Sequence, residues 1–334
     1  MTQYQVTLIA GDSIGPRAAD ATRALIAATG VNIAWDVVPC GELSLAAGGE
    51  ALPQALYDSV RRTGVALKGQ FRTAIGSGKE SPNVALRKAL DLFAAVRPLK
   101  TMPGAASRYD KVDFTVVREA TEDVYAGIEH KIAPGIIQGI KVTTRRACER
   151  IVRHAFAVAR REGRTKLTLL HKANIMKKAD GLFLSVGKEI AAEFPDIAFD
   201  AMIADNACMQ LVRKPEQFQV LVAQNLFGDL MSDLGAGLVG GIAHVHGVLE
   251  GDGAVKVFEA IHGLDVASEG TDGACPLPFF RAGSALLRHL GEGAAADRID
   301  GAIARTLGDG LRAKGAAGTL TTAAFTEAVV ARLG

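Results

Sequence analysis

The chain has 334 residues, of which 49% are hydrophobic and 22% are charged, so it can fill one large core or two moderate ones. This composition excludes disordered and fibrous proteins. The 38 Lys and Arg residues exceed the 36 Asp and Glu residues by only two, which argues against nonspecific binding of nucleic acid. The apolar runs are shorter than a membrane span, and the N-terminus lacks the pattern of a secretory signal. We therefore expect a soluble cytoplasmic protein with no nucleic-acid or membrane partner.

Strand and helix patterns alternate from the N-terminus onward. Residues 5–10 predict a short buried strand, which is followed by a turn at 11–15 and a helix that begins at Pro16. Further strands are predicted at 64–69, 113–119, 166–172 and 218–224, separated by helical stretches rich in Ala and Leu. The fold class is therefore α/β. The glycine-rich stretch 235–253 is the best candidate for a crossing between domains.

The turn at 11–15 lies where a dinucleotide-binding loop would lie, but its sequence GDSIG is not GxGxxG. Any cofactor must therefore be held in another way. The four cysteines are far apart and have no CxxC spacing, which indicates isolated reduced thiols.

Three arginines lie in sequence that is otherwise typical of a protein core. Arg87 and Arg97 flank an apolar stretch, and Arg118 ends the predicted strand at 113–119. Each of them alone is explained by an internal carboxylate partner or by a side chain that reaches the surface. If the three converge, their planar guanidinium groups suit a small polycarboxylate. The sequence alone does not decide between these alternatives.

Several other polar residues lie at positions that suit metal binding or proton transfer. Asp229 and Asp233 are four residues apart in an apolar helical run and therefore share one helix face. The pair either binds Mg²⁺ or Mn²⁺, or one aspartate caps the helix and the other pairs with a lysine. Asp205 precedes an apolar helical run and is expected to be an N-cap. Lys172 lies at the carboxyl end of the strand at 166–172, where it is either a base or an ordinary surface lysine. Tyr125 lies in an acidic segment.

Read in order, these segments resemble the isocitrate/isopropylmalate dehydrogenase family of metal-dependent oxidative decarboxylases, from about residue 6 to 330. The motifs that carry the resemblance are GDSIGP, SPNVALRKALDLFAAVRP, VREATEDVYAGIEH, HKANIMKKADGLF, IADNACMQLV, NLFGDLMSDLGAGLVGG and FEAIHG. The segment Ser81-Pro82-Asn83 is similar to the version found in family members that act on isocitrate.

The resemblance implies a role for each candidate residue. The substrate carboxylates would be bound by Arg87, Arg97 and Arg118, with Ser81 and Asn83 selecting isocitrate. The metal would be held by Asp205, Asp229 and Asp233, and the catalytic residues would be Lys172 as the base and Tyr125 as the proton donor. The cofactor would be bound by Thr73, Asn83, Asn174, His262 and Gly263.

The resemblance also implies how the chain is built. Residues 1–95 and 241–334 would form a large α/β domain, and residues 96–240 a smaller one that carries the dimer contact. Lys172 and Asp205 would reach into the active site of the other subunit, so the protein would be a homodimer with shared active sites. Isocitrate would be oxidised and decarboxylated, with NAD as the cofactor and Mg²⁺ or Mn²⁺ as the metal.

The cofactor loop departs from the family. Between Leu264 and Gly273 the acidic residues are Asp265, Glu269 and Asp272 and there is no Lys or Arg, so the 2′-phosphate of NADP would be repelled. The position expected to decide cofactor choice is at or near Ala267, and Cys275 replaces the usual adenine-contacting Asn. We therefore predict NAD over NADP. A metal site at His244 and His246 is the weaker interpretation of that pair.

Three functions remain open at this stage. The first is an NAD-dependent isocitrate dehydrogenase, and the second is a related decarboxylase for a longer substrate such as homoisocitrate. The third is a catalytically silent regulatory paralogue, which would be expected to have lost some of the catalytic residues that this chain retains.

Overall fold

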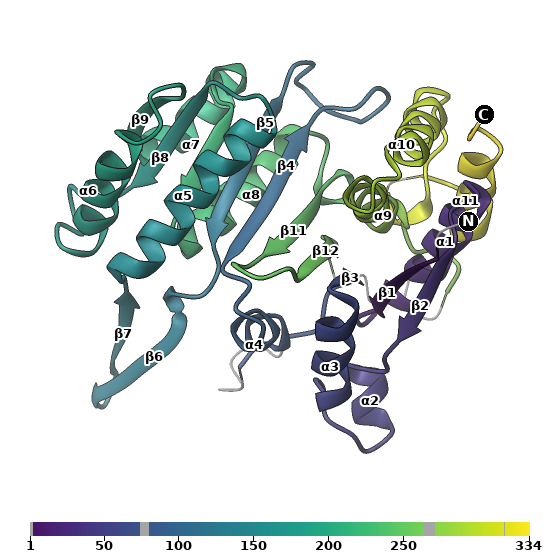
Figure 1. The fold of residues 1–334 in the computed structure, drawn as a ribbon, viewed down its shortest axis with the longest axis horizontal. Helices are drawn as coiled ribbons and strands as arrows, with labels where there is room; N and C mark the ends of the chain where they lie inside the picture. Colours follow the sequence, from purple (N-terminus) through teal and green to yellow (C-terminus); the bar gives the residue numbers. More distant parts are fainter. Residues whose placement is uncertain (1–2, 74–79, 264–270, 317) are drawn as a thin grey trace.

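The computed structural model describes residues 3–73, 80–263, 271–316 and 318–334, and these form a wide mixed sheet with helices on both faces (Figure 1). The strands are β1 (Tyr4–Ile9), β2 (Ile33–Val37), β3 (Val65–Lys68), β4 (Ala94–Lys100), β5 (Asp113–Glu119), β6 (Asp123–Ala133), β7 (Ile136–Val142), β8 (Lys166–His171), β9 (Ala198–Ile203), β10 (Val220–Ala223), β11 (His246–Glu250) and β12 (Lys256–Ala260). The α/β class predicted from the alternating pattern is confirmed.

The helices lie between these strands and after them. They are α1 (Gly15–Ala28), α2 (Glu42–Ala46), α3 (Gln54–Thr63), α4 (Pro82–Ala89), α5 (Arg145–Arg161), α6 (Ala179–Ala191), α7 (Ala204–Arg213), α8 (Asn225–Leu238), α9 (Leu277–His289), α10 (Gly293–Gly308) and α11 (Thr322–Val330), with short 3₁₀ turns η1 (Pro215–Gln217), η2 (Ile242–His244) and η4 (Lys314–Ala316). No helix in the described ranges is both long enough and apolar enough to cross a membrane.

The elements that were predicted agree closely with observed ones, but seven of the twelve strands in the described residues were not predicted, namely β2, β4, β6, β7, β9, β11 and β12. The strands expected at 5–10, 64–69, 113–119, 166–172 and 218–224 correspond to β1, β3, β5, β8 and β10, and the helix expected from Pro16 is α1. The run that carries Asp229 and Asp233 is helix α8, as predicted. The four cysteines are free thiols, also as predicted.

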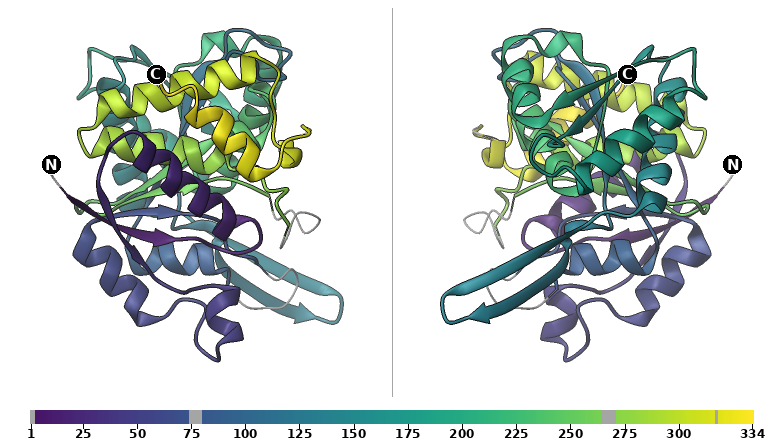
Figure 2. Two further views of the ribbon diagram at one scale, coloured as in Figure 1. Left: turned by 90° about the vertical axis from the view of Figure 1, so that its right-hand side faces the viewer. Right: turned by 90° about the vertical axis from the view of Figure 1, so that its left-hand side faces the viewer.

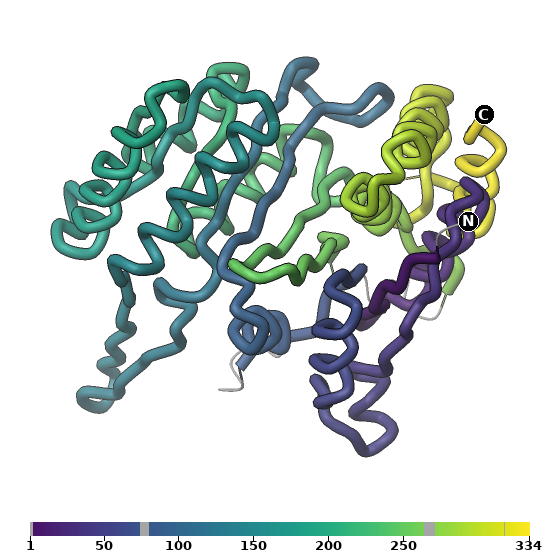
Figure 3. Tube along the Cα trace, in the orientation of Figure 1, coloured from purple at the N-terminus to yellow at the C-terminus, as the bar shows by residue number. Residues whose placement is uncertain are grey.

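In the described residues the large sheet has ten strands in the order β2-β1-β3-β12-β11-β4-β5-β10-β8-β9. The two chain ends lie side by side and build one part of the molecule together (Figure 3). Leu25 and Ile26 of α1 pack there with Phe325 and Val329 of α11. The glycine-rich stretch 235–253 contains β11, which pairs with β12 on one side and β4 on the other. The sheet therefore continues through the expected crossing between domains, and the domain division stays a prediction.

Side chains alternate between the two faces of the sheet. In β5, Val117 packs in the cluster that contains α5 and α6, whereas Val116 packs in the cluster that contains α7 and α8. This period of two is what a strand covered on both faces requires. Arg118 shares its face with Val116, so the strand itself directs this guanidinium toward α8.

Strands β6 and β7 form a hairpin that projects from the body of the molecule (Figure 2). Its apolar side chains are unusually open for their type: Ile132 is 62% exposed, and Ile136 and Ile137 are 54% and 61% exposed. Apolar side chains gathered on one projecting element are typical of a surface that another protein chain covers.

Candidate active site

Arg118 and Asp229 are brought together by neighbouring strands. Arg118 near the end of β5 pairs in register with Ala223 at the end of β10, and β10 leads directly into α8. The Arg118 Nε donates to Asn225 Oδ1 at 2.9 Å, and its Nη1 forms an ion pair with Asp229. Gly228 makes this approach possible, since a Cβ there would lie 2.6 Å from Arg118 Cγ.

The other two arginines face the same carboxylate. Arg97 of β4 lies opposite Val116 of β5, so it projects from the same face as Arg118, and its Nη1 is 3.7 Å from Asp229 Oδ1. Arg87 of α4 lies close enough to interact electrostatically with Arg97 and Asp229. The structure therefore gathers Arg87, Arg97 and Arg118 into one group. We call these three arginines, Asp229 and Tyr125 the arginine cluster.

Tyr125 of β6 completes the arginine cluster. Its hydroxyl donates a hydrogen bond to Asp229, and its ring lies 5.0 Å from the Arg118 guanidinium carbon. Burial and the hydrogen bond to Asp229 raise the pKa of Tyr125, so the phenol carries its proton at neutral pH.

The cluster holds more positive charge than Asp229 neutralises. Arg87 and Arg97 are each 7% exposed and Arg118 is 2% exposed. Burial, together with the neighbouring Arg97, lowers the pKa of Arg118 to about 10, although Asp229 opposes this shift. Within the described residues the Nε atoms of Arg87 and Arg97 have no hydrogen-bond partner. Buried cations with unused donors suit an anionic ligand.

Lys172 and Asp205 form a second group. Lys172 follows β8 and Asp205 follows β9, two parallel strands whose last residues, His171 and Ile203, are paired in register. The Lys172 Nζ lies 2.6 Å from Asp205 Oδ1, and the Asp205 side chain is 69% exposed. This ion pair lowers the pKa of Asp205.

The expectation that Asp205 is an N-cap was wrong. The N-cap of α7 is Ile203, and Asp205 is the second residue of the helix. Strand β9 ends at Ile203 and α7 begins at Ala204, so no loop residue with a capping side chain lies between them. Asp205 still favours the helix electrostatically, because a carboxylate in the first turn interacts well with the helix dipole.

The three aspartates expected to hold a metal are not gathered within one chain. Asp229 and Asp233 are one turn apart on α8, while Asp205 belongs to the second group. In the described ranges, no three His, Cys, Asp or Glu side chains are placed to share a metal ion, His244 and His246 included. Carboxylate oxygens nevertheless fit Mg²⁺ or Mn²⁺, so the donor chemistry is suitable provided that Asp205 comes from a second subunit.

The two residues expected to select the substrate lie at the start of α4. Ser81 is the N-cap of this helix, and its hydroxyl is 2.8 Å from that of Thr73. The Asn83 amide holds the neighbouring segment in place, since it donates to Phe71 O at 3.0 Å and accepts from Lys68 Nζ at 2.9 Å. Asn83 is thus occupied within its own chain, and its contact with substrate stays a prediction.

A buried ion pair that none of the sequence motifs indicates lies beneath the arginine cluster. Lys68 is fully buried in β3, and its Nζ lies 2.8 Å from Glu259 Oε1 of β12. Lys68 and nearby Arg97 keep the pKa of Glu259 at about 2, against the opposing effect of burial. The available signal was a charged residue at the end of the apolar run VALK and another inside the apolar run VFEA.

Two of the residues expected to bind the cofactor lie at a small cavity. His262 and Gly263 line a cavity of about 220 Å³ together with Cys275, near the end of β12. The His262 Nε2 accepts from the Gln70 N–H at 3.2 Å, and burial lowers the pKa of this histidine. Asn174 is exposed and lies in the segment that follows Lys172. Asn174 is therefore associated with the second group and not with His262.

Part of the loop that was expected to choose the cofactor lies outside the described residues, including Asp265, Ala267 and Glu269. Asp272 is described, and its carboxylate forms an ion pair with Arg17 at 2.9 Å. Its charge is therefore already balanced, which weakens the part of the charge argument against NADP that rests on Asp272.

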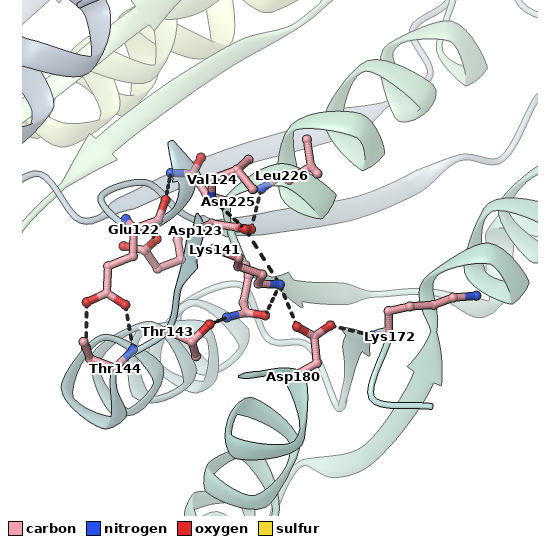
Figure 4. A network of polar contacts seen from close by, with 12 residues as sticks. Glu122, Asp123, Val124, Lys141, Thr143, Thr144, Lys172, Asp180, Asn225 and Leu226 are labelled. Atoms are coloured by element: carbon pink, nitrogen blue, oxygen red, sulfur yellow. Dashed lines mark hydrogen bonds and ion pairs between the residues drawn. The ribbon is translucent and has the colours of Figure 1, made fainter. Parts of the chain in front are cut away.

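A buried polar network connects the hairpin with Lys172 and with the start of α8 (Figure 4). Lys141 of β7 donates to Asp180 Oδ1 at 2.6 Å and to Gln224 Oε1 at 2.9 Å. Asp180 in turn accepts the Lys172 backbone N–H at 2.6 Å. The network therefore fixes the backbone of Lys172 relative to the start of α8.

Replacing Lys141 should test how much this network contributes to stability. A Lys141→Met variant leaves the fully buried Asp180 without its cation, which we expect to lower the free energy of unfolding by roughly 3 to 5 kcal/mol. The measurement is urea unfolding, with Lys188→Met as the control because Lys188 is exposed on the same helix as Asp180. Equal stability of the two variants would contradict the assigned role.

Comparison with known proteins gives a consistent family. Residues 5–329 match the model of the isocitrate/isopropylmalate dehydrogenase family. The chain is 41% identical over 327 residues to a regulatory subunit of the mitochondrial isocitrate dehydrogenase [NAD] of Dictyostelium discoideum, covering 97% of this chain and 89% of that one. It is 40% identical over 329 residues to the Arabidopsis thaliana isocitrate dehydrogenase [NAD] catalytic subunit 5, mitochondrial, covering 98% and 88%.

A solved structure agrees with these sequence matches. The crystal structure of isocitrate dehydrogenase from Methylococcus capsulatus superposes with a TM-score of 0.94 at 43% identity, covering 99% of each chain. The family expected from the motifs and the mixed α/β fold are both confirmed. The chain belongs to the isocitrate/isopropylmalate dehydrogenase family, whose members are NAD(P)-dependent oxidative decarboxylases of β-hydroxy acids.

Proposed function

We propose that the protein catalyses the oxidative decarboxylation of isocitrate to 2-oxoglutarate and CO₂ with NAD. The observation that carries this proposal is the convergence of three buried arginines beside Tyr125 and Asp229. Guanidinium groups bind carboxylates with two parallel hydrogen bonds, so three of them suit a tricarboxylic acid better than a monoacid. A substrate carboxylate would compete with Asp229 for Arg118.

The residues proposed to hold the metal are Asp229 and Asp233 of one subunit and Asp205 of the other. When bound, Mg²⁺ or Mn²⁺ would supply Lewis-acid stabilisation of the negative charge that develops on the substrate. Exposure of the Asp205 side chain leaves it accessible to a second chain.

Two residues of this chain are proposed to move protons. Lys172 would accept the proton of the substrate hydroxyl, and Tyr125 would return a proton to C3 after CO₂ is lost. The raised pKa of Tyr125 supports its assignment as the donor, because the phenol is protonated at neutral pH. The network around Asp180 holds the Lys172 backbone in position for the partner site.

The assembly proposed for this function is a homodimer with shared active sites. The exposed isoleucines of the β6–β7 hairpin give it an apolar surface to cover. In this arrangement residues 1–95 and 241–334 form the large domain and residues 96–240 the small one. The cytoplasmic location expected from the sequence stays a prediction.

An assay that varies both the substrate and the cofactor tests the proposed function. The purified protein with Mn²⁺ should reduce NAD in the presence of isocitrate, with a lower kcat/KM for NADP, homoisocitrate and 3-isopropylmalate. The order of the four kcat/KM values identifies the substrate and the cofactor. No turnover with any pair would indicate a regulatory paralogue, the role given in the name of the Dictyostelium relative.

A further inference from the structure

Strands β4, β11 and β12 lie side by side in the middle of the sheet and present two different faces. One face carries Arg97 of the arginine cluster and Glu259 beneath it. Because side chains alternate along a strand, the adjacent residues Pro98 and Phe258 point to the opposite face. There they line a cavity of about 480 Å³ together with residues of α5 and α9, here called the back cavity.

Four cationic side chains from three elements border the back cavity. They are Arg161 at the end of α5, Lys256 of β12, and Arg281 and Arg288 of α9. The side chains of Arg161 and Arg288 are 48% and 47% exposed, so a molecule that enters from solvent can reach both. The basic residues thus approach the cavity from opposite sides.

The acidic side chains of the back cavity already have partners. Glu250 accepts from Lys256 at 3.1 Å, lies 2.7 Å from His154 Nε2 and forms a longer ion pair with Arg161 at 3.4 Å. These cationic neighbours hold the pKa of Glu250 at about 2 in spite of burial. Asp300 accepts from Arg281 at 3.1 Å and from Arg288 at 2.8 Å. Arg288 also pairs with Asp297 at 2.7 Å, so the four cations of the lining are balanced by carboxylates, and the case for a ligand rests on the unused donors of the cavity.

Buried polar groups in the lining also lack partners. His246 is 7% exposed, and within the described part of the chain its Nδ1 has no hydrogen-bond partner. The same is true of the Nε of Arg281, whose side chain is 14% exposed. Buried polar groups that make no hydrogen bond cost free energy, and a bound ligand is one way to recover it.

We propose that the back cavity is a second binding site, for a compact anion of carboxylate or phosphate chemistry held between Arg161 and the α9 arginines. The volume is suited to a small molecule and not to a protein segment. Guanidinium forks on two sides favour a planar or tetrahedral oxyanion. This site lies on the opposite face of the sheet from the arginine cluster, so its occupation does not depend on turnover of isocitrate.

Calorimetric titration with inorganic phosphate and with citrate tests this proposal. The titrations use the dimeric protein in an Arg118→Met background, which weakens anion binding at the arginine cluster. Arg161→Met should weaken the tighter of the two anions roughly tenfold or more, as expected for one lost charged hydrogen bond. Arg160→Met is the matched control. Arg160 is adjacent in sequence but forms an ion pair with Asp196 at 2.6 Å and does not line the cavity. Whichever anion binds more tightly identifies the ligand class.

The outcomes separate the proposal from its alternatives. Binding that survives Arg118→Met and Arg160→Met but is weakened by Arg161→Met and Arg281→Met supports it. Binding that is lost in Arg118→Met, or that survives there but is unchanged when Arg161→Met is added, overturns the proposal, because the anion then occupies the arginine cluster or another surface. If Arg118→Met does not fold, a crystal of the unaltered protein soaked with tungstate places the oxyanion directly. No density between Arg161 and Arg281, or no affinity in solution, would also end the proposal.

Discussion

A heterodimer of a Lys172→Met chain and an Asp229→Asn chain should recover about half of the wild-type turnover, although each variant alone is inactive. Lys172 and Asp229 belong to separate groups in one chain, Lys172 with Asp205 and Asp229 with the arginine cluster. If each active site takes Lys172 from the other subunit, one of the two sites in the heterodimer contains both native residues. The two chains carry different affinity tags, and the heterodimer is purified before the rate of NADH formation is measured.

A second heterodimer provides the control for this experiment. When Asp229→Asn is combined with Arg118→Met, both changes lie in the arginine cluster, so every site keeps one defect and no recovery is expected. If Lys172 acted within its own chain, the first heterodimer would be as inactive as its parents. That result would refute the shared active site, and the role of the arginine cluster is tested separately by the Arg118 variants.

Replacing Arg118 with Met should reduce kcat/KM for isocitrate by roughly 100-fold to 10,000-fold, because two charged hydrogen bonds to a carboxylate are lost at about 1.5 to 3 kcal/mol each. We expect the stability to change little. Burial and the neighbouring Arg97 lower the pKa of Arg118 to about 10. Removing Arg118 therefore also relieves repulsion between the arginines of the cluster. Steady-state kinetics and urea unfolding measure the two effects separately.

Two further variants give this prediction its controls. Arg118→Lys retains the charge but not the planar fork, so its kcat/KM should fall between those of the wild type and Arg118→Met. Arg153→Met removes an exposed arginine that pairs with Glu193 on the surface, and it should leave the kinetics unchanged. If Arg118→Met had a normal KM and kcat, the arginine cluster would not be the substrate site.

Local patterns in the sequence predict part of the fold, since a strand of continuous apolar residues is recognisable without its neighbours. Seven strands of the described residues, among them β4 and β12, were nevertheless not predicted. The convergence of the arginines depends on pairing that no local pattern specifies. Arg97 and Arg118 share a face only because Arg97 lies opposite Val116 and Ala95 opposite Arg118. For these residues the family motifs were the stronger guide.

The remaining differences have equally physical causes. Asp205 is not an N-cap because β9 continues directly into α7, and residue preferences at helix ends do not foresee a missing loop. The Lys68–Glu259 pair joins residues 191 positions apart along the chain, so its partners become neighbours only when β3 and β12 pair. Contacts of this kind are a property of the sheet and not of either segment.

The continuity of the large sheet determines how the molecule can deform. One side of the sheet contains β2, β1, β3, β12 and β11, and the other contains β4, β5, β10, β8 and β9. The two sides meet where β11 pairs with β4 through three residue pairs, from Val248 with Val96 to Glu250 with Ala94. Any relative movement of the two sides must therefore be absorbed as a change of twist across this narrow ladder, without a swinging linker. Arg97 and Arg118, on adjacent strands beyond it, would travel together as a rigid pair, while Lys68 and Glu259 would stay behind on the other side.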